Sequence, residues 1–138
     1  MFEGFIASGK VRKGTPDIAL AKSLIAMSVS QLAFVSANPI SESTASPILV
    51  NYYEALREIC EAICAKNGYK VYSHEAYTSY LKEQLKEERI SMQFDRLRKL
   101  RNGVNYYGEF VSVEETQAAR REVPLLIDTL KKKHLSGL

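Results

Sequence analysis

A basic stretch late in the chain, residues 96–108, carries the side chains best suited to chemistry. It reads RLRKLRNGVNYYG, so four cations within six residues precede two amides, two phenols and a final glycine. Asp95 is the last acid before the stretch and Glu109 is the first one after it. Because no acid within the stretch can neutralise these cations, the pattern indicates a surface that binds an anion, and phosphate is the commonest candidate.

Helical spacing places several of these side chains on one face. Arg98 and Arg101 are three residues apart and Arg101 and Asn105 are four apart, which makes them neighbours on a helix surface. The planar guanidinium of arginine matches phosphate oxygens and keeps its charge at neutral pH. We therefore predict a phosphate- or nucleotide-binding site made of Arg98, Arg101, Asn105 and Tyr107, with Asn102 holding Arg101 or the ligand by hydrogen bonds.

An alternative interpretation is a solvated basic face without a ligand. Its arginines would pair with acids of neighbouring helices, and the candidate acids are Glu54, Glu58 and Glu61. The chain would then be a purely structural helical dimerisation domain. These two interpretations differ in whether Arg101 is free to bind a phosphate.

The residues from Arg101 onward resemble the motif of the HEPN superfamily. That motif, most often Arg-Asn-x-x-x-His, lies near the end of an all-helical domain. Arg101 and Asn102 match its first half, and Tyr106 stands where histidine is expected. Two long helices at the front and one helix after the motif extend the likeness to roughly residues 15–135. The resemblance implies a homodimer in which arginines and histidines of two protomers converge on one RNA phosphodiester without metal.

The tyrosine at the histidine position decides which activity we expect. Proton transfer from a ribose 2′-hydroxyl needs a group that titrates near pH 7, and a phenol is a poor replacement for an imidazole. We therefore expect a nucleotide- or RNA-binding domain that is catalytically weak or inactive. The alternative is a metal-independent endoribonuclease of the toxin type, whose catalytic residues would be Arg101, Asn102 and Tyr106.

The resemblance also implies a protein partner. In some HEPN proteins of toxin–antitoxin-type systems, a tyrosine two residues after the histidine accepts nucleotidyl groups from a minimal nucleotidyltransferase. Tyr107 lies one residue before that position, which Gly108 occupies. We accordingly expect a nucleotidyltransferase as a partner besides RNA or a nucleotide.

Few other residues carry chemistry. His74 is expected to be an exposed residue of a first helical turn, and His134 a solvated cationic helix end. Cys60 and Cys64 are four residues apart, which fits neither a zinc nor a redox motif, so we interpret them as small core residues. We expect no metal and no cofactor.

The hydrophobic pattern predicts an all-α fold, an up-and-down bundle of four to five helices. The start and stop signals are Thr15-Pro16 to Asn38, Ser46-Pro47 to Asn67-Gly68, Ser73 onward, Ser91 to Gly108, and a capping box at Ser112–Glu115. Pro124 should kink or divide the last helix. Residues 15–138 form a single domain, and residues 1–14, rich in glycine, form an arm that is loose or laid across it, without a helix.

Composition narrows the class of protein further. A length of 138 residues with 46% hydrophobic residues suits one globular domain with a real core. The net charge of +3 gives only a slight preference for anionic partners. Because no continuous apolar run approaches the roughly 18 residues of a membrane span, we expect no membrane association and a reducing, cytoplasmic location.

Overall fold

Helix α3 (Ala45–Lys66) is the centre of the structure because its sequence is apolar on almost every face. Fifteen of its 22 residues are buried in the computed structural model, which describes residues 1–138. A helix that is apolar nearly all round needs neighbours on all sides. Helices α2 (Ile18–Ser36), α5 (Glu88–Tyr107) and α6 (Val113–His134) supply them, each in direct contact with α3.

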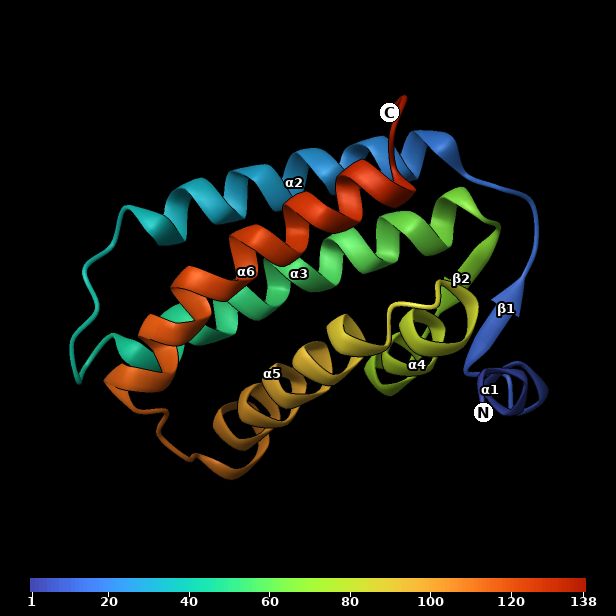
Figure 1. Cartoon of the computed structure of the whole chain (residues 1–138). Helices are drawn as coiled ribbons and strands as arrows, with labels where there is room; N and C mark the ends of the chain where they lie inside the picture. The colour runs from blue at the N-terminus through green and yellow to red at the C-terminus, as the bar shows by residue number, and fades with distance from the viewer.

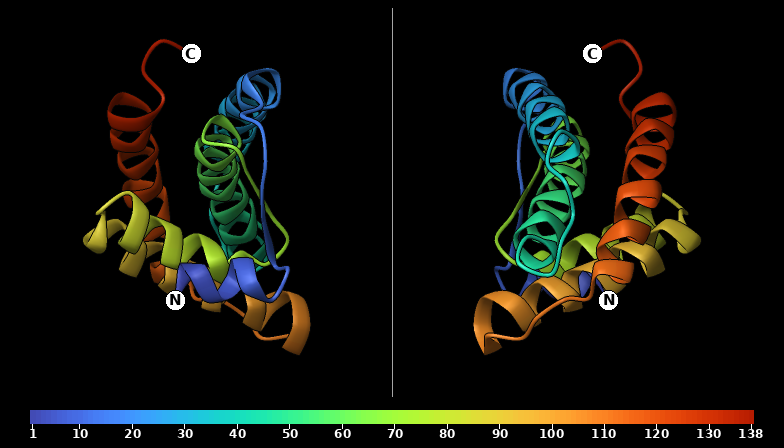
Figure 2. Two further views of the ribbon diagram at one scale, coloured as in Figure 1. Left: turned by 90° about the vertical axis from the view of Figure 1, so that its right-hand side faces the viewer. Right: turned by 90° about the vertical axis from the view of Figure 1, so that its left-hand side faces the viewer.

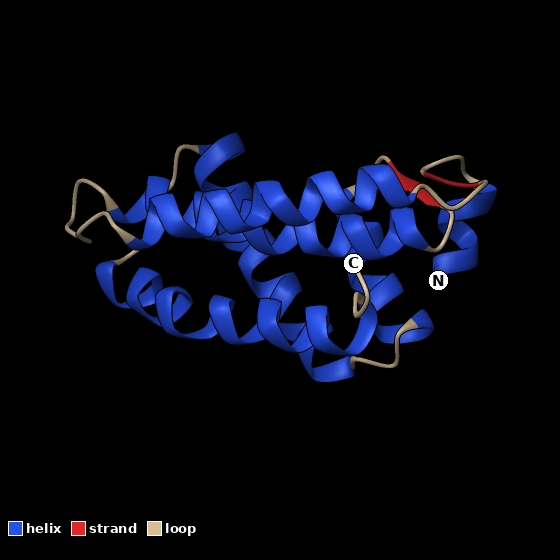
Figure 3. Cartoon of the chain, turned by 90° about the horizontal axis from the view of Figure 1, so that it is seen from above, coloured by secondary structure: helices blue, strands red, loops and turns tan.

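The chain is an all-α bundle, as the sequence predicts, with four long helices that alternate in direction (Figure 1). The α2–α3 pair lies on one side and α6 on the other, while α4 and α5 cross beneath them (Figure 2). The shorter elements are α1 (Phe2–Ala7), α4 (His74–Ser79), the π-helical turn η1 (Tyr80–Gln84), and strands β1 (Val11–Lys13) and β2 (Tyr69–Val71). The two strands lie at the end of the bundle near the N-terminus (Figure 3).

Two helices begin at other residues than predicted. The N-cap of α2 is Asp17 rather than Thr15, and its carboxylate accepts a hydrogen bond from the Leu20 amide at 3.0 Å. Helix α3 begins before Ser46, whose buried hydroxyl instead accepts a hydrogen bond from the Val111 amide at 2.8 Å. The signals at Thr15 and Ser46 depend only on neighbouring residues, whereas the observed role of Ser46 depends on the packing of the distant segment around Val111.

The predictions for the last two helices, α5 and α6, are confirmed only in part. Helix α5 begins at Glu88, so Ser91 lies inside the first turn and its hydroxyl donates to the Glu88 carbonyl at 2.6 Å. The capping box of Ser112 and Glu115 is confirmed. Of the kink or division predicted at Pro124, the division does not occur, because α6 continues through this residue. The buried face of α6 against α3 outweighs the single backbone hydrogen bond that proline removes.

The N-terminal segment is more ordered than its glycines indicate. The prediction that it contains no helix is wrong, because α1 forms and buries Phe2 completely. The Phe2 ring packs 5.3 Å from the Tyr69 ring and 5.1 Å from the Tyr80 ring, and its amide donates to Glu83 at 3.0 Å. The segment is not loose, since it packs against the end of the bundle at β2 and η1. Aromatic packing therefore provides the free energy that the local sequence lacks.

Strand β1 is joined to the end of α3 by a close backbone contact. The predicted stop of α3 at Asn67-Gly68 is confirmed, with Gly68 at a φ of +86°. The Gly14 amide donates to the Gly68 carbonyl at 2.6 Å. A Cβ atom at residue 68 would lie 2.4 Å from the Gly14 carbonyl oxygen, so no larger residue fits here without displacement of β1.

Arg120 ties three helices together at the opposite end of the bundle. Its guanidinium, on α6, donates to the carbonyls of Val35 and Asn38 at 2.8 and 2.6 Å, where α2 ends. It also donates to the Tyr52 hydroxyl of α3 at 2.9 Å. A cation at a helix C-terminus satisfies carbonyls that have no partner within the helix. Arg120 thus has a structural role.

Helix α2 leaves much of its apolar surface uncovered. Only Ala21, Leu24, Ser28 and Val35 are buried, whereas Phe34 is 64% exposed. By length and hydropathy alone, α2 is the one helix that could cross a membrane, although cores and signal sequences pass the same test. The absence of a membrane association and the cytoplasmic location therefore stay predictions.

Candidate functional site

Arg101 lies where α3, α4 and α5 meet, and two tyrosine rings contact it. Its guanidinium carbon is 5.6 Å from the ring centre of Tyr53 on α3 and 5.5 Å from that of Tyr106 on its own helix. The side chain is only 14% exposed. Cation–π contacts of this kind hold a guanidinium in place without neutralising its charge.

The donors of Arg101 are incompletely satisfied. Its Nη1 atom donates to Asn102 Oδ1 and to the Tyr106 hydroxyl, both at 3.2 Å. The nearest acid is Glu54, whose Oε1 lies 3.9 Å from Nη2, and the buried Nε has no partner. The structure therefore brings together Arg101, Asn102 and Tyr106, the three residues that the sequence singles out, around a cation with spare donors.

Glu54 is shared between two arginines, and Arg57 engages it more closely than Arg101 does. Its Oε2 accepts hydrogen bonds from Arg57 Nε at 3.1 Å and from Nη2 at 3.0 Å. Arg57 also donates to Glu61 at 2.5 Å, one turn further along α3. These three side chains form a polar strip on α3, next to Arg101. Two acids of the alternative interpretation thus pair mainly with a cation of their own helix.

Arg98 behaves differently from Arg101. Its Nε and Nη2 atoms lie 3.0 and 2.9 Å from Asp95 Oδ1, one turn earlier on α5. Partial burial of Asp95 raises its pKa, but hydrogen bonds from Lys99, Arg98 and Thr78 outweigh this and hold the pKa below its usual value. The predicted phosphate-binding cation Arg98 is therefore already paired within its own helix.

The remaining predicted ligand residues lie at the exposed end of α5. Asn105 and Tyr107 make no hydrogen bond within the chain through their side chains, and Tyr107 is 76% exposed. Gly108, at a φ of 65°, ends the helix as predicted. The role of Tyr107 as a nucleotide acceptor stays a prediction.

Gly103 permits a close approach of Glu109 to the helix. The Glu109 amide donates to the Gly103 carbonyl at 3.0 Å where the chain turns back after α5. A Cβ atom at residue 103 would lie 2.7 Å from Glu109 Oε2. A larger residue at this position would move the Glu109 side chain away from the helix.

His74 is the residue of this region that the sequence reasoning missed. The expectation that it is exposed is wrong, since it is half-buried and its Nδ1 lies 2.9 Å from the Tyr53 hydroxyl. Burial, followed by the nearby cations Arg57 and Arg101, lowers its pKa. His74 and Arg101 therefore contact the same tyrosine. No local pattern links residue 74 to residue 53, because the contact depends on how β2 directs α4 against α3.

The cysteines and the second histidine lie outside this group. Cys60 and Cys64 are free and buried, which confirms their interpretation as core residues, and burial raises the pKa of Cys60 to about 12. His134 is half-buried at the end of α6, and its Nε2 has no partner. No group of three or more His, Cys, Asp or Glu side chains forms a potential metal site.

No protein-family profile, curated protein or solved structure matches this chain. The proposals below therefore depend on the contacts around Arg101 and on the resemblance of residues 96–108 to the HEPN motif. The resemblance itself stays a proposal.

We predict that the free energy of unfolding decreases as the pH falls below about 6.5. The folded-state pKa values of His74 and His134 are lowered, chiefly by burial, so the unfolded chain binds more protons in this range. The histidines' contribution to stability is thus fully present above that pH and is lost as the pH falls through the folded pKa values. Urea unfolding at about pH 7.5 and 5.5 measures the effect. His74→Gln should show a smaller decrease, and an unchanged decrease would refute the assignment to His74.

Proposed function

We propose that this chain is a HEPN-like RNA- or nucleotide-binding domain in which Arg101 holds a phosphate group. The observation that carries the proposal is the incomplete pairing of Arg101, which has neutral acceptors at 3.2 Å and its nearest acid only at 3.9 Å. A phosphate oxygen at Nη2, whose nearest acid is 3.9 Å away, would add a hydrogen bond and balance the charge. Asn102 and Tyr106 orient the guanidinium, and Tyr106 can also donate to the ligand.

The contrast with other cations of α5 supports Arg101 as the anchor. Arg98 is engaged by Asp95, and Arg96 is paired at 2.6 Å with Glu122 of α6. An anion would have to displace an existing carboxylate partner from either of them, whereas Arg101 would lose only a distant one. The replacement of the motif histidine by Tyr106 favours binding over catalysis.

Arg101→Gln should weaken the binding of a single-stranded RNA 12-mer by about tenfold or more, or about 1.4 kcal/mol. Arg96→Gln removes the same charge from the same helix and is the matched control, with an expected change below about twofold. Fluorescence anisotropy at several salt concentrations measures both, and wild-type affinity should decrease as salt is added. Equal effects of the two substitutions, or no binding by the wild type, would count against the proposal.

A second candidate function is a metal-independent endoribonuclease, and the position of His74 favours it. In the tautomer whose Nδ1–H donates to the Tyr53 hydroxyl, Nε2 carries a lone pair. With its lowered pKa, His74 is neutral at pH 7 and can accept the proton of a ribose 2′-hydroxyl. The 2′-oxygen would attack phosphorus as the bond to the 5′-oxygen breaks. Tyr106 would protonate that leaving oxygen, and Arg101 would stabilise the charge on phosphorus.

If this second function is correct, the wild type cleaves single-stranded RNA in the presence of a chelator and leaves a 2′,3′-cyclic phosphate. His74→Gln should then reduce the rate by about 10²- to 10⁴-fold while RNA affinity stays unchanged. His134→Gln is the matched control and should retain the rate. Gel analysis of a labelled oligonucleotide measures cleavage. The absence of cleavage at high protein concentration would leave binding alone.

We further infer that the chain forms a homodimer through the outward face of α2. One shallow depression on this face is lined by Ala26, Met27, Ser30, Gln31 and Phe34. None of these residues is charged, so two copies can meet without like-charge repulsion, and the small ones permit close packing of helices. The face also leaves large apolar side chains in water, which a second copy would cover.

Sedimentation equilibrium should therefore show a dimer that Met27→Glu dissociates, because the substitution places a charge in the apolar contact. Met92→Glu is the matched control, since Met92 is 68% exposed on α5, and it should remain dimeric. A wild type that is monomeric at about 0.1 mM would contradict this inference. Binding of the monomer to phospholipid vesicles would instead indicate a membrane surface as the partner of α2.

A further inference from the structure

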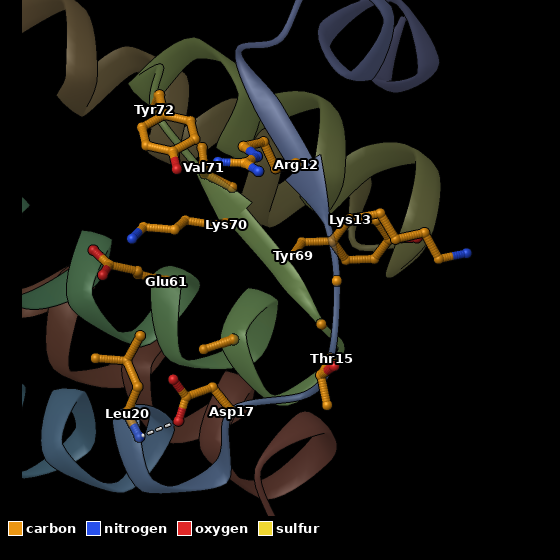
Figure 4. Close-up of a pocket in the computed structure, with 13 residues that line it drawn as sticks. Arg12, Lys13, Thr15, Asp17, Leu20, Glu61, Tyr69, Lys70, Val71 and Tyr72 are labelled. Atoms are coloured by element: carbon orange, nitrogen blue, oxygen red, sulfur yellow. Dashed lines mark hydrogen bonds between the residues drawn. The ribbon is translucent and has the colours of Figure 1, made fainter.

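A pocket away from Arg101 lies between the β1–β2 ribbon, the start of α2 and the end of α3 (Figure 4). It has a volume of about 380 Å³ and is lined by both polar and apolar side chains. The pocket is separate from the Arg101 site, and its wall includes part of the N-terminal arm. The register of the two strands determines which charged side chains line the pocket.

The antiparallel register places two cations directly opposite each other. Arg12 pairs with Lys70, while the neighbouring pair Val11–Val71 turns to the other face, where Val11 is buried. Alternation along the strands puts Tyr72 on the same face as Lys70, and Figure 4 shows Arg12, Lys70 and Tyr72 on one side of the ribbon. Like charges at directly opposed positions repel each other and destabilise a strand pair. An anion between them would remove this repulsion.

The acids of the pocket do not neutralise these cations. Neither Arg12 nor Lys70 has an ion-pair partner within 4.0 Å. Lys70 extends towards Glu61 in Figure 4, but the Glu61 carboxylate is engaged by Arg57 at 2.5 Å. Asp17 accepts the hydrogen bond that caps α2. Glu61 thus has another cationic partner, and Asp17 keeps its charge at the start of α2 without forming an ion pair with Arg12 or Lys70.

An exposed aromatic ring completes this face. Tyr72 is 53% exposed, and the Lys70 ammonium lies 5.8 Å from its ring centre. The Tyr72 amide donates to the Lys10 carbonyl at 2.8 Å, which extends the ladder and makes Lys10 the residue opposite Tyr72. Cations beside an exposed ring are the combination with which proteins bind single-stranded nucleic acids, the cations contacting phosphates and the ring stacking on a base.

We propose that this pocket binds single-stranded RNA, with a phosphate between Arg12 and Lys70 and a base stacked on Tyr72. The inference rests on the proposed function in that the same strand would continue to Arg101. The polar strip of α3 joins the two places, because Arg57 contacts both Glu61, which lines the pocket, and Glu54, which lies beside Arg101. The chain also passes directly from Tyr72 to His74, which contacts the Tyr53 ring beneath Arg101.

The test measures affinity for an oligouridine 12-mer. The double variant Arg12→Gln/Lys70→Gln should bind about tenfold or more weakly, and its slope of log affinity against log salt should fall by about 0.7 per lost phosphate contact. Tyr72→Ala should weaken binding about fivefold or more through lost stacking. Lys82→Gln/Lys132→Gln removes two charges elsewhere and is the matched control. An equal loss in this control would overturn the inference.

The variants also separate this inference from the proposed function. Wild-type affinity in Arg12→Gln/Lys70→Gln together with weakened binding in Arg101→Gln would overturn the pocket and leave Arg101 in place. The reverse pattern would support the pocket and overturn the role of Arg101, and a wild type that binds no RNA would overturn both. Because Arg12 and Lys70 repel each other, their removal should leave the thermal midpoint unchanged or raise it. A lowered midpoint would show a structural role and overturn the inference.

Discussion

The burial of α3 on nearly all of its surface is the constraint on which the rest of the structure depends. Its apolar residues can leave water only if α2, α5 and α6 surround it, and those helices are long because α3 is long. Glu54, Arg57 and Glu61 form a partly exposed charged strip on this helix, whereas Glu58 is buried. Both candidate binding surfaces lie along that strip, so the packing of the core also determines where ligands can approach.

The difference between Arg98 and Arg101 follows from position on one helix. Arg98 has an acid, Asp95, three residues before it, at a spacing where side chains meet. The residue three before Arg101 is Arg98, a cation, so an acidic partner must come from another helix. Glu54 is the only acid within 4.0 Å, and Arg57 competes for it. Two arginines one turn apart on the same helix therefore differ: Arg98 is paired with an acid, whereas Arg101 keeps donors without a close acidic partner.

Sequence periodicity predicts the long helices because the apolar residues that a helix buries against distant segments recur every three or four positions along it. The chain order and the all-α class follow from it, as do the stops at Gly68 and Gly108, where the backbone needs a positive φ. The contact of Arg101 with Tyr106 does not follow from helical spacing, because that spacing makes neighbours of residues three and four apart and these two are five apart. The helix at residues 2–7 and the position of His74 cannot be predicted from the local sequence either. They depend on aromatic partners, Tyr69, Tyr80 and Tyr53, that lie far away in the sequence.

The close contact between Gly68 and Gly14 at the β1–β2 ribbon is possible only because residue 68 has no Cβ atom. Because a Cβ atom at residue 68 would clash with a carbonyl oxygen of the opposite segment, even alanine would force the first strand outward. The four long helices do not involve this contact, so such a change would spare them. In evolution, a single codon could therefore shift the charged face of the ribbon relative to an otherwise intact bundle, while Phe2 keeps the amino-terminal helix in place.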